Sequence, residues 1–74
     1  LTTNILIGRH TLLLPGCTLS HDTSIGDFCT LMPGVRITGG ATIGNHAHIG
    51  AGTLITRHIT IPPNTTIPPG SILQ

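Results

Sequence analysis

Large aliphatic residues recur at every sixth position from one end of the chain to the other. Every position in this series is leucine or isoleucine: Leu1, Ile7, Leu13, Leu19, Ile25, Leu31, Ile37, Ile43, Ile49, Ile55, Ile61, Ile67 and Leu73. Four residues after each of the first twelve stands a small or β-branched residue: Ile5, Thr11, Cys17, Thr23, Cys29, Val35, Ala41, Ala47, Thr53, Ile59, Thr65 and Ser71. An α-helix repeats about every 3.6 residues and a strand every second residue, so neither explains a period of six. The pattern predicts short strands separated by tight corners, with the first and fifth places of each hexamer facing inward.

Three such hexamers close one triangular coil, and the length of the chain then predicts an all-β fold of about four stacked 18-residue coils, a parallel β-helix. Glycine and proline gather at the second, third and fourth places, where tight corners favour them. Because the register never slips, residues 18 apart stack in columns. One column holds His21, Gly39 and Arg57, and its neighbour holds Asp22, Gly40 and His58.

Composition narrows the classes of function that the chain can have. Charged residues make up 7% of the chain and the net charge is +1, so we expect neither nucleic acid nor an anionic membrane as a partner. No apolar run reaches the roughly 18 residues of a transmembrane helix, and the pattern of a signal peptide is missing. Cys17 and Cys29 both occupy the inward fifth place and are predicted to be core residues with inert thiols. A core of this size supplies only about 3–5 kcal/mol, so we expect the chain to oligomerise.

Residues 19–28, with the sequence LSHDTSIGDF, carry the most specific motif in the chain. Together with Pro33-Gly34, Gly39-Gly40, Ile43-Gly44 and the IGAG segment 49–52, they resemble the hexapeptide-repeat acyltransferases, and among these the branch of sialic-acid O-acetyltransferases and sugar-nucleotide N-acetyltransferases. The resemblance spans the whole chain. It implies a left-handed β-helix, a homotrimer, acetyl-CoA as acyl donor, a sugar or sugar nucleotide as acceptor, and a cytoplasmic role in bacterial surface-glycan synthesis.

Members of that branch carry a small sugar-nucleotide-binding domain before the β-helix. Since the repeat is already in progress at residue 1 and still in progress at residue 74, we interpret residues 1–74 as the acyltransferase domain of a longer chain.

His21 is the candidate catalytic residue. It stands at the third place of its hexamer, so its side chain should point outward from a corner. Acetyl transfer from a thioester to an amine or hydroxyl needs a base for the proton of the acceptor, and imidazole titrates near neutral pH. Asp22 is placed to accept a hydrogen bond from the other ring nitrogen and so to fix the tautomer. A histidine of this kind is usually a solvated surface residue; the Ile25–Phe28 segment shifts the interpretation to catalysis, because the resemblance assigns the same roles to His21 and Asp22.

The resemblance also implies where the acyl donor binds, in a groove between neighbouring helices of the trimer. Counted outward from His21, the matching positions are Thr30, Ala51 and Pro69. Thr30 departs from the branch, which often carries a second histidine near the acetyl group. Arg57 is a further candidate for contact with a phosphate of CoA or of a sugar nucleotide. Aliphatic residues at outward places predict the trimer contact: Leu12, Leu14, Met32, Leu54 and Ile72.

Two alternatives come from other classes of protein. Zinc-dependent, carbonic-anhydrase-like proteins share the repeat and bind the metal through three histidines, but His10 and His46 lie two coils apart, about 10 Å, which is too far for one ion. We therefore expect no metal. A structural β-helix without catalysis, such as an ice-binding surface, favours an unbroken threonine ladder, and His48 interrupts Thr30 and Thr66. The remaining histidines are assigned to the surface or to an interface: His10, His46, His48 and His58. The acceptor, and the choice between O- and N-acetylation or another branch of acetyltransferases, stay open.

Overall fold

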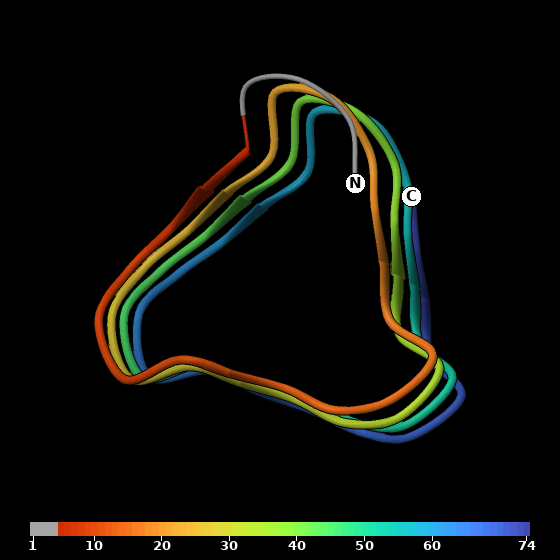
Figure 1. The fold of residues 1–74 in the computed structure, drawn as a ribbon. Coiled ribbons are helices and arrows are strands. Elements are labelled where there is room, and N and C mark those ends of the chain that lie inside the picture. Colours follow the sequence, from red (N-terminus) through yellow and green to blue (C-terminus); the bar gives the residue numbers. More distant parts are fainter. Residues whose placement is uncertain (1–4) are drawn as a thin grey trace.

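The computed structural model describes residues 5–74, which form a left-handed parallel β-helix of about four coils. Figure 1 looks along the stack and shows each coil following the three sides of a triangle. The predicted fold class is confirmed. The described part of the chain holds no helix that is long and apolar enough to cross a membrane.

Each side of the triangle is a four-stranded parallel sheet of two-residue strands. The first sheet contains β1 (Leu6–Ile7), β4 (Ser24–Ile25), β7 (Thr42–Ile43) and β10 (Thr60–Ile61). The second contains β2 (Leu12–Leu13), β5 (Thr30–Leu31), β8 (His48–Ile49) and β11 (Thr66–Ile67). The third contains β3 (Thr18–Leu19), β6 (Arg36–Ile37), β9 (Leu54–Ile55) and β12 (Ile72–Leu73). Strand partners are 18 residues apart throughout, as in Thr30 beside His48, so the columns predicted from the sequence are confirmed.

The core lies inside the triangle and consists of the first and fifth places of the hexamers. Its fully buried members include Leu31, Ile49 and Ile55 at the first place. Thr23 and Thr53, at the fifth place, are also fully buried, and their hydroxyls donate to the carbonyls of Ser20 and Pro68. Cys29 is buried, Cys17 is half-buried, and both thiols are free, as the sequence predicts. Leu1, the first residue of the aliphatic series, lies outside the described residues.

The three corners of the triangle consist of the second, third and fourth places. Corner 1 contains residues 8–10, 26–28, 44–46 and 62–64; corner 2 contains residues 14–16, 32–34, 50–52 and 68–70; corner 3 contains residues 20–22, 38–40 and 56–58. Within residues 5–74 the fourth place has positive φ in every hexamer: His10, Gly16, Asp22, Phe28, Gly34, Gly40, His46, Gly52, His58, Asn64 and Gly70. This left-handed conformation suits glycine best, yet the protein also imposes it on histidine, asparagine, aspartate and phenylalanine.

Backbone hydrogen bonds join each coil to the next in a fixed pattern. The N–H groups of the sixth and second places donate to the following coil, as from Leu6 to the carbonyl of Thr23 at 3.0 Å. The N–H of the fourth place donates back to the third place of the preceding coil, as from Phe28 to Arg9 at 2.8 Å. The N–H of the third place takes no part in this pattern. What satisfies it therefore depends on the side chains at each corner.

Candidate functional site

Corner 3 contains both predicted catalytic residues. His21 and Asp22 lie between β3 and β4, and the loops of the next two coils bring Gly39-Gly40 and Arg57-His58 into the same two columns. The side chains of His21 and Asp22 are 62% and 58% exposed, so both are open to a substrate in the single chain.

The carboxylate of Asp22 lies beside the ring of His21, with 3.2 Å between Oδ2 and Nδ1. A proton on Nδ1 is donated to this carboxylate, and the tautomer that results leaves a lone pair on Nε2. The adjacency of the two residues does not by itself produce this contact. It depends on the positive φ of 59° at Asp22, which the corner imposes.

The ring of His21 rests against Gly39, one coil further along the column. A Cβ added at Gly39 would lie 2.6 Å from Cε1, 2.8 Å from Nε2 and 3.0 Å from Nδ1 of His21. Any side chain at this position would displace the ring, because ordinary contacts with a Cβ begin near 3.4 Å. Gly39 does not have positive φ, so the close approach of the imidazole, and not backbone conformation, requires glycine here.

The N–H of Gly39 is the unusual polar group of this corner. Gly39 is buried, and its N–H makes no hydrogen bond within residues 5–74. Buried backbone N–H groups are nearly always paired, so the N–H of Gly39 is a free donor beside the exposed imidazole of His21. The sequence pattern predicted a corner glycine but had no means of locating this free donor.

His58 rests against Gly40 as His21 rests against Gly39. A Cβ added at Gly40 would lie 2.6 Å from Nδ1 and 2.8 Å from Cε1 of His58. The sequence analysis assigned His58 to the surface, and the residue is indeed exposed. The column that pairs it with Gly40 was the available signal for a role at corner 3, since a missing side chain leaves room for a neighbouring ring.

The other predicted site residues lie away from His21 within one chain. Thr30 is half-buried in β5, on the side of the triangle between corners 1 and 2. Ala51 and Pro69 share one column of corner 2, where Ala51 is half-buried and Pro69 is exposed. The third sheet lies between corner 2 and corner 3, and Thr30 lies in the second sheet, which does not adjoin corner 3. A single chain therefore does not bring the predicted base and the predicted donor-binding residues together.

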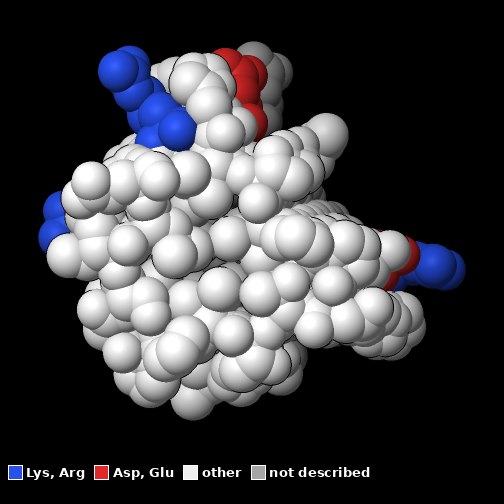
Figure 2. Space-filling view, turned by 180° about the vertical axis from the view of Figure 1, so that it is seen from behind, with Lys and Arg blue, Asp and Glu red and all other residues white. Residues whose placement is uncertain are grey.

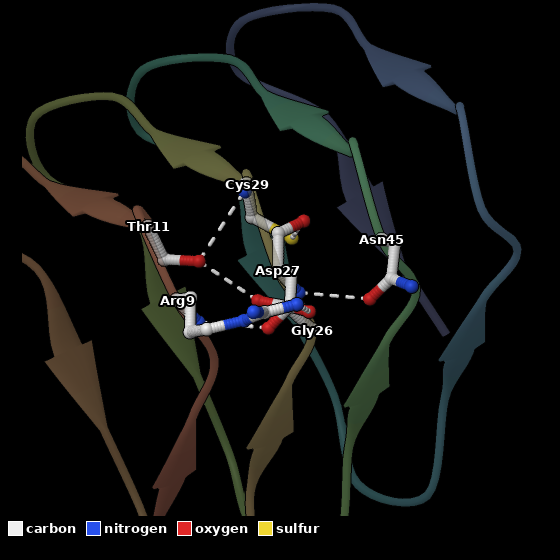
Figure 3. Close-up of polar contacts among 6 residues, drawn as sticks. All are labelled: Arg9, Thr11, Gly26, Asp27, Cys29 and Asn45. Carbon is white, nitrogen blue, oxygen red and sulfur yellow. Dashed lines mark hydrogen bonds and ion pairs between the residues drawn. The ribbon is translucent and has the colours of Figure 1, made fainter.

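Corner 1 carries a ladder of polar side chains (Figure 3). Asp27 Oδ1 accepts from the N–H of Arg9 at 2.7 Å, and Asn45 Oδ1 accepts from the N–H of Asp27 at 2.8 Å. The guanidinium of Arg9 also lies 3.4 Å from Asp27 Oδ2. The hydrogen bond from the N–H of Arg9, assisted by the charge of its guanidinium, lowers the pKa of Asp27 below the usual 3.8. The third-place N–H groups of Arg9 and Asp27 are thus satisfied, whereas that of Gly39 at corner 3 is not.

An aromatic stack adds to corner 1. The rings of His10 and His46 lie on the two sides of Phe28, with centroids 5.1 and 5.2 Å away and interplanar angles of 17° and 4°. Within residues 5–74, no three His, Cys, Asp or Glu side chains are grouped so that they would hold a metal ion.

Charged and aliphatic side chains share part of the surface, since Arg36 pairs with Leu54 and Leu54 with Ile72 in the third sheet. Figure 2 shows the end of the stack seen from behind Figure 1, with charged side chains along its rim and none on the face itself. Of the aliphatic residues predicted to face outward, Leu12 and Ile72 are exposed, at 58% and 60%. The other three are only partly exposed: Leu14, Met32 and Leu54. Together they follow corner 2 and the two sheets that meet there.

The model of the bacterial transferase hexapeptide family, which describes six repeats, matches residues 4–39 and again residues 22–57. The chain belongs to this family. The two overlapping matches cover corner 3 from His21 to Arg57, so the candidate site lies within the part of the chain that the family describes. No curated protein and no solved structure matches this member of the bacterial transferase hexapeptide family.

Proposed function

We propose that the protein transfers an acetyl group from acetyl-CoA to an amino or hydroxyl group of a sugar, with His21 as the general base. Membership of the transferase hexapeptide family supports an acyltransferase. The observation that carries the proposal is the arrangement at corner 3, where an exposed imidazole, held by Asp22, occupies the place that a side chain of Gly39 would take, and Gly39 is a buried glycine with an unpaired N–H. The sugar acceptor, sialic acid or a nucleotide-linked amino sugar, rests on the resemblance of residues 19–28 to that branch.

The chemistry assigns one task to each group. Nε2 of His21 takes the proton of the acceptor amine or hydroxyl while its nitrogen or oxygen attacks the thioester carbonyl. The carbonyl oxygen becomes an oxyanion, and the N–H of Gly39 is a donor for this charge. The carbon–sulfur bond then breaks, and the proton on His21 passes to the thiolate of CoA. Asp22 holds the tautomer and favours the imidazolium that forms between the two proton transfers.

The active unit in this proposal is a homotrimer. Thr30, Ala51 and Pro69, which the resemblance assigns to acetyl-CoA, lie away from His21 in the same chain, so a neighbouring copy has to supply them. The aliphatic side chains along corner 2 support this arrangement, since they would place a neighbour beside Ala51 and Pro69. Acetyl-CoA as the donor makes the cytoplasm the site of action.

The test is acetyl-CoA turnover by the full chain and by its His21→Ala variant, on a panel of amino-sugar nucleotides and sialic acid. We expect the variant to lose about a hundredfold or more in turnover and to retain acetyl-CoA binding. Unchanged turnover would exclude His21 as the base. Absence of both turnover and acetyl-CoA binding in the unaltered protein would instead favour a structural β-helix.

A further inference from the structure

His58 has no role in the proposed chemistry, yet its surroundings differ from those of the comparable histidine at corner 1. His46 and His58 occupy the same place of the hexamer, and both have a φ of 62°. The ring of His46 stacks on Phe28 at 5.2 Å, so a neighbour of the same corner accounts for its position. The ring of His58 has no stacking partner and makes no side-chain hydrogen bond within residues 5–74. Its contact is the bare backbone of Gly40.

The two imidazoles of corner 3 approach neighbouring residues from opposite sides. His21 comes from the preceding coil onto Gly39, and His58 comes from the following coil onto Gly40. The backbone between them is held in place, because the N–H of Gly40 donates to the carbonyl of His21 at 3.0 Å and the N–H of His58 donates to that of Gly39 at 3.2 Å. A group bound over the glycine pair would therefore touch both rings at once.

We propose that His58 is a second acceptor-contacting residue, which holds the acceptor sugar over Gly39-Gly40 beside the base. This inference rests on the proposed function for its substrate. An imidazole provides one hydrogen-bond donor, one acceptor and a flat face, which suit a ring that carries hydroxyl groups. Its task is binding, with no proton transfer in the reaction. Loss of the ring should therefore weaken binding of the acceptor in the ground state and the transition state alike.

The kinetic test compares His58→Asn with the matched control His46→Asn. Asparagine fits this backbone, since Asn64 has the same place in the hexamer and the same φ of 62°. We expect His58→Asn to raise KM for the acceptor about tenfold, with kcat within about threefold and an unchanged KM for acetyl-CoA, and His46→Asn to leave both KM values unchanged. A KM for the acceptor that is equal in the two variants would overturn the inference. If His58→Asn is neutral while His21→Ala is inactive, the proposed function stands and the role of His58 fails.

A binding measurement separates the two proposals even without turnover. The chain has five histidines, so the Cε1–H signals in a carbon–proton NMR spectrum can be assigned with single variants. Sialic acid and a uridine-diphosphate amino sugar would each be titrated into the full chain. We expect the signals of His21 and His58 to shift together while those of His10 and His46 stay in place. Shifts at His58 without turnover would retain the binding site and reject the transferase. An unmoved His58 signal with both sugars would reject the site.

Discussion

Corner 1 and corner 3 have the same backbone conformation but differ in the contacts that their side chains make. At corner 1, the side chains of Asp27 and Asn45 accept from the third-place N–H groups of Arg9 and Asp27, and Phe28 fills the space between two imidazoles. At corner 3, a glycine pair takes the places of the carboxylate and the aromatic ring. The imidazoles then lie on bare backbone, and the N–H of Gly39 has no partner within residues 5–74.

The difference separates stability from chemistry within one repeat. At corner 1 the polar and aromatic side chains mostly contact one another, which stabilises the stack and leaves few groups free to bind a ligand. A corner that leaves a donor and a base unpaired gives up such contacts, which proteins usually accept only at functional sites. Corner 3 is therefore the candidate site, and corner 1 provides residues of the same types for controls.

Adding one methyl group at each corner should give the sharpest contrast. In Gly39→Ala the ring of His21 must retreat by about 1 Å, and a displacement of that size costs about a hundredfold in rate. The ring is the flexible end of a side chain, so we expect the denaturation midpoint to change little. In Gly26→Ala the new Cβ meets Oδ1 of Asn45 and lies 2.9 Å from its backbone nitrogen. We expect the free energy of unfolding of this variant to fall by about 1–3 kcal/mol, while the activity per folded molecule stays nearly unchanged.

Turnover assays and denaturant titrations of the two variants check this contrast. Neither position has positive φ, so alanine adds no backbone strain at either corner. If both variants lost stability and retained activity, corner 3 would be no different from corner 1.

The hydrogen bond from His21 to Asp22 should contribute a smaller part of the rate. We expect Asp22→Ala to lower kcat/KM about tenfold, since the imidazole loses the acceptor that fixes its tautomer. Asp22→Asn retains a carbonyl oxygen and tolerates the φ of 59°, and it should recover most of the loss. Steady-state kinetics of the two variants test this order, and equal losses would indicate that the negative charge matters and the hydrogen bond does not.

The aromatic stack of corner 1 should affect stability alone. Phe28→Asn removes both ring pairs and retains a residue that tolerates positive φ, and we expect a loss of about 1 kcal/mol. His46→Asn removes one of the two pairs and should lose about half as much. Denaturant midpoints measure both, and a fall in turnover per folded molecule would show that corner 1 takes part in the chemistry.

The smallest expected effect is a loss of stability on lowering the pH. The pKa of Asp27 is lowered in the folded chain, chiefly by the hydrogen bond from the N–H of Arg9. Its carboxylate therefore stabilises the fold at pH values above the usual pKa of 3.8, which the unfolded chain has, and this contribution disappears as the pH falls through the folded pKa. Melting temperatures taken from about pH 5 down to pH 3 should fall more steeply for the unaltered chain than for Asp27→Asn. Parallel curves would argue against the ladder at corner 1.

Much of the fold was determined by the sequence alone, because a period of six allows few geometries. The inward residues, the register and the columns all follow from counting. The structure confirms them, although Ile7 in the first described coil is 41% exposed. His21 could be placed outward at a corner, and Phe28 between His10 and His46, by arithmetic in steps of 18. The resemblance of residues 19–28 supplied the proposed chemical role of His21.

Only the tertiary structure decided how the side chains of one coil pack against the next coil. The hexamer pattern specifies a column but not the rotamer of a residue in it, which depends on the atoms that the adjacent coils present. The contacts of His21 with Gly39 and of His58 with Gly40 are of this kind. The free N–H of Gly39 is another example, because an N–H can be identified as unpaired only when the positions of all neighbouring acceptors are known. Counting along the chain could place these residues together, whereas their exposure to a substrate depends on the three-dimensional packing.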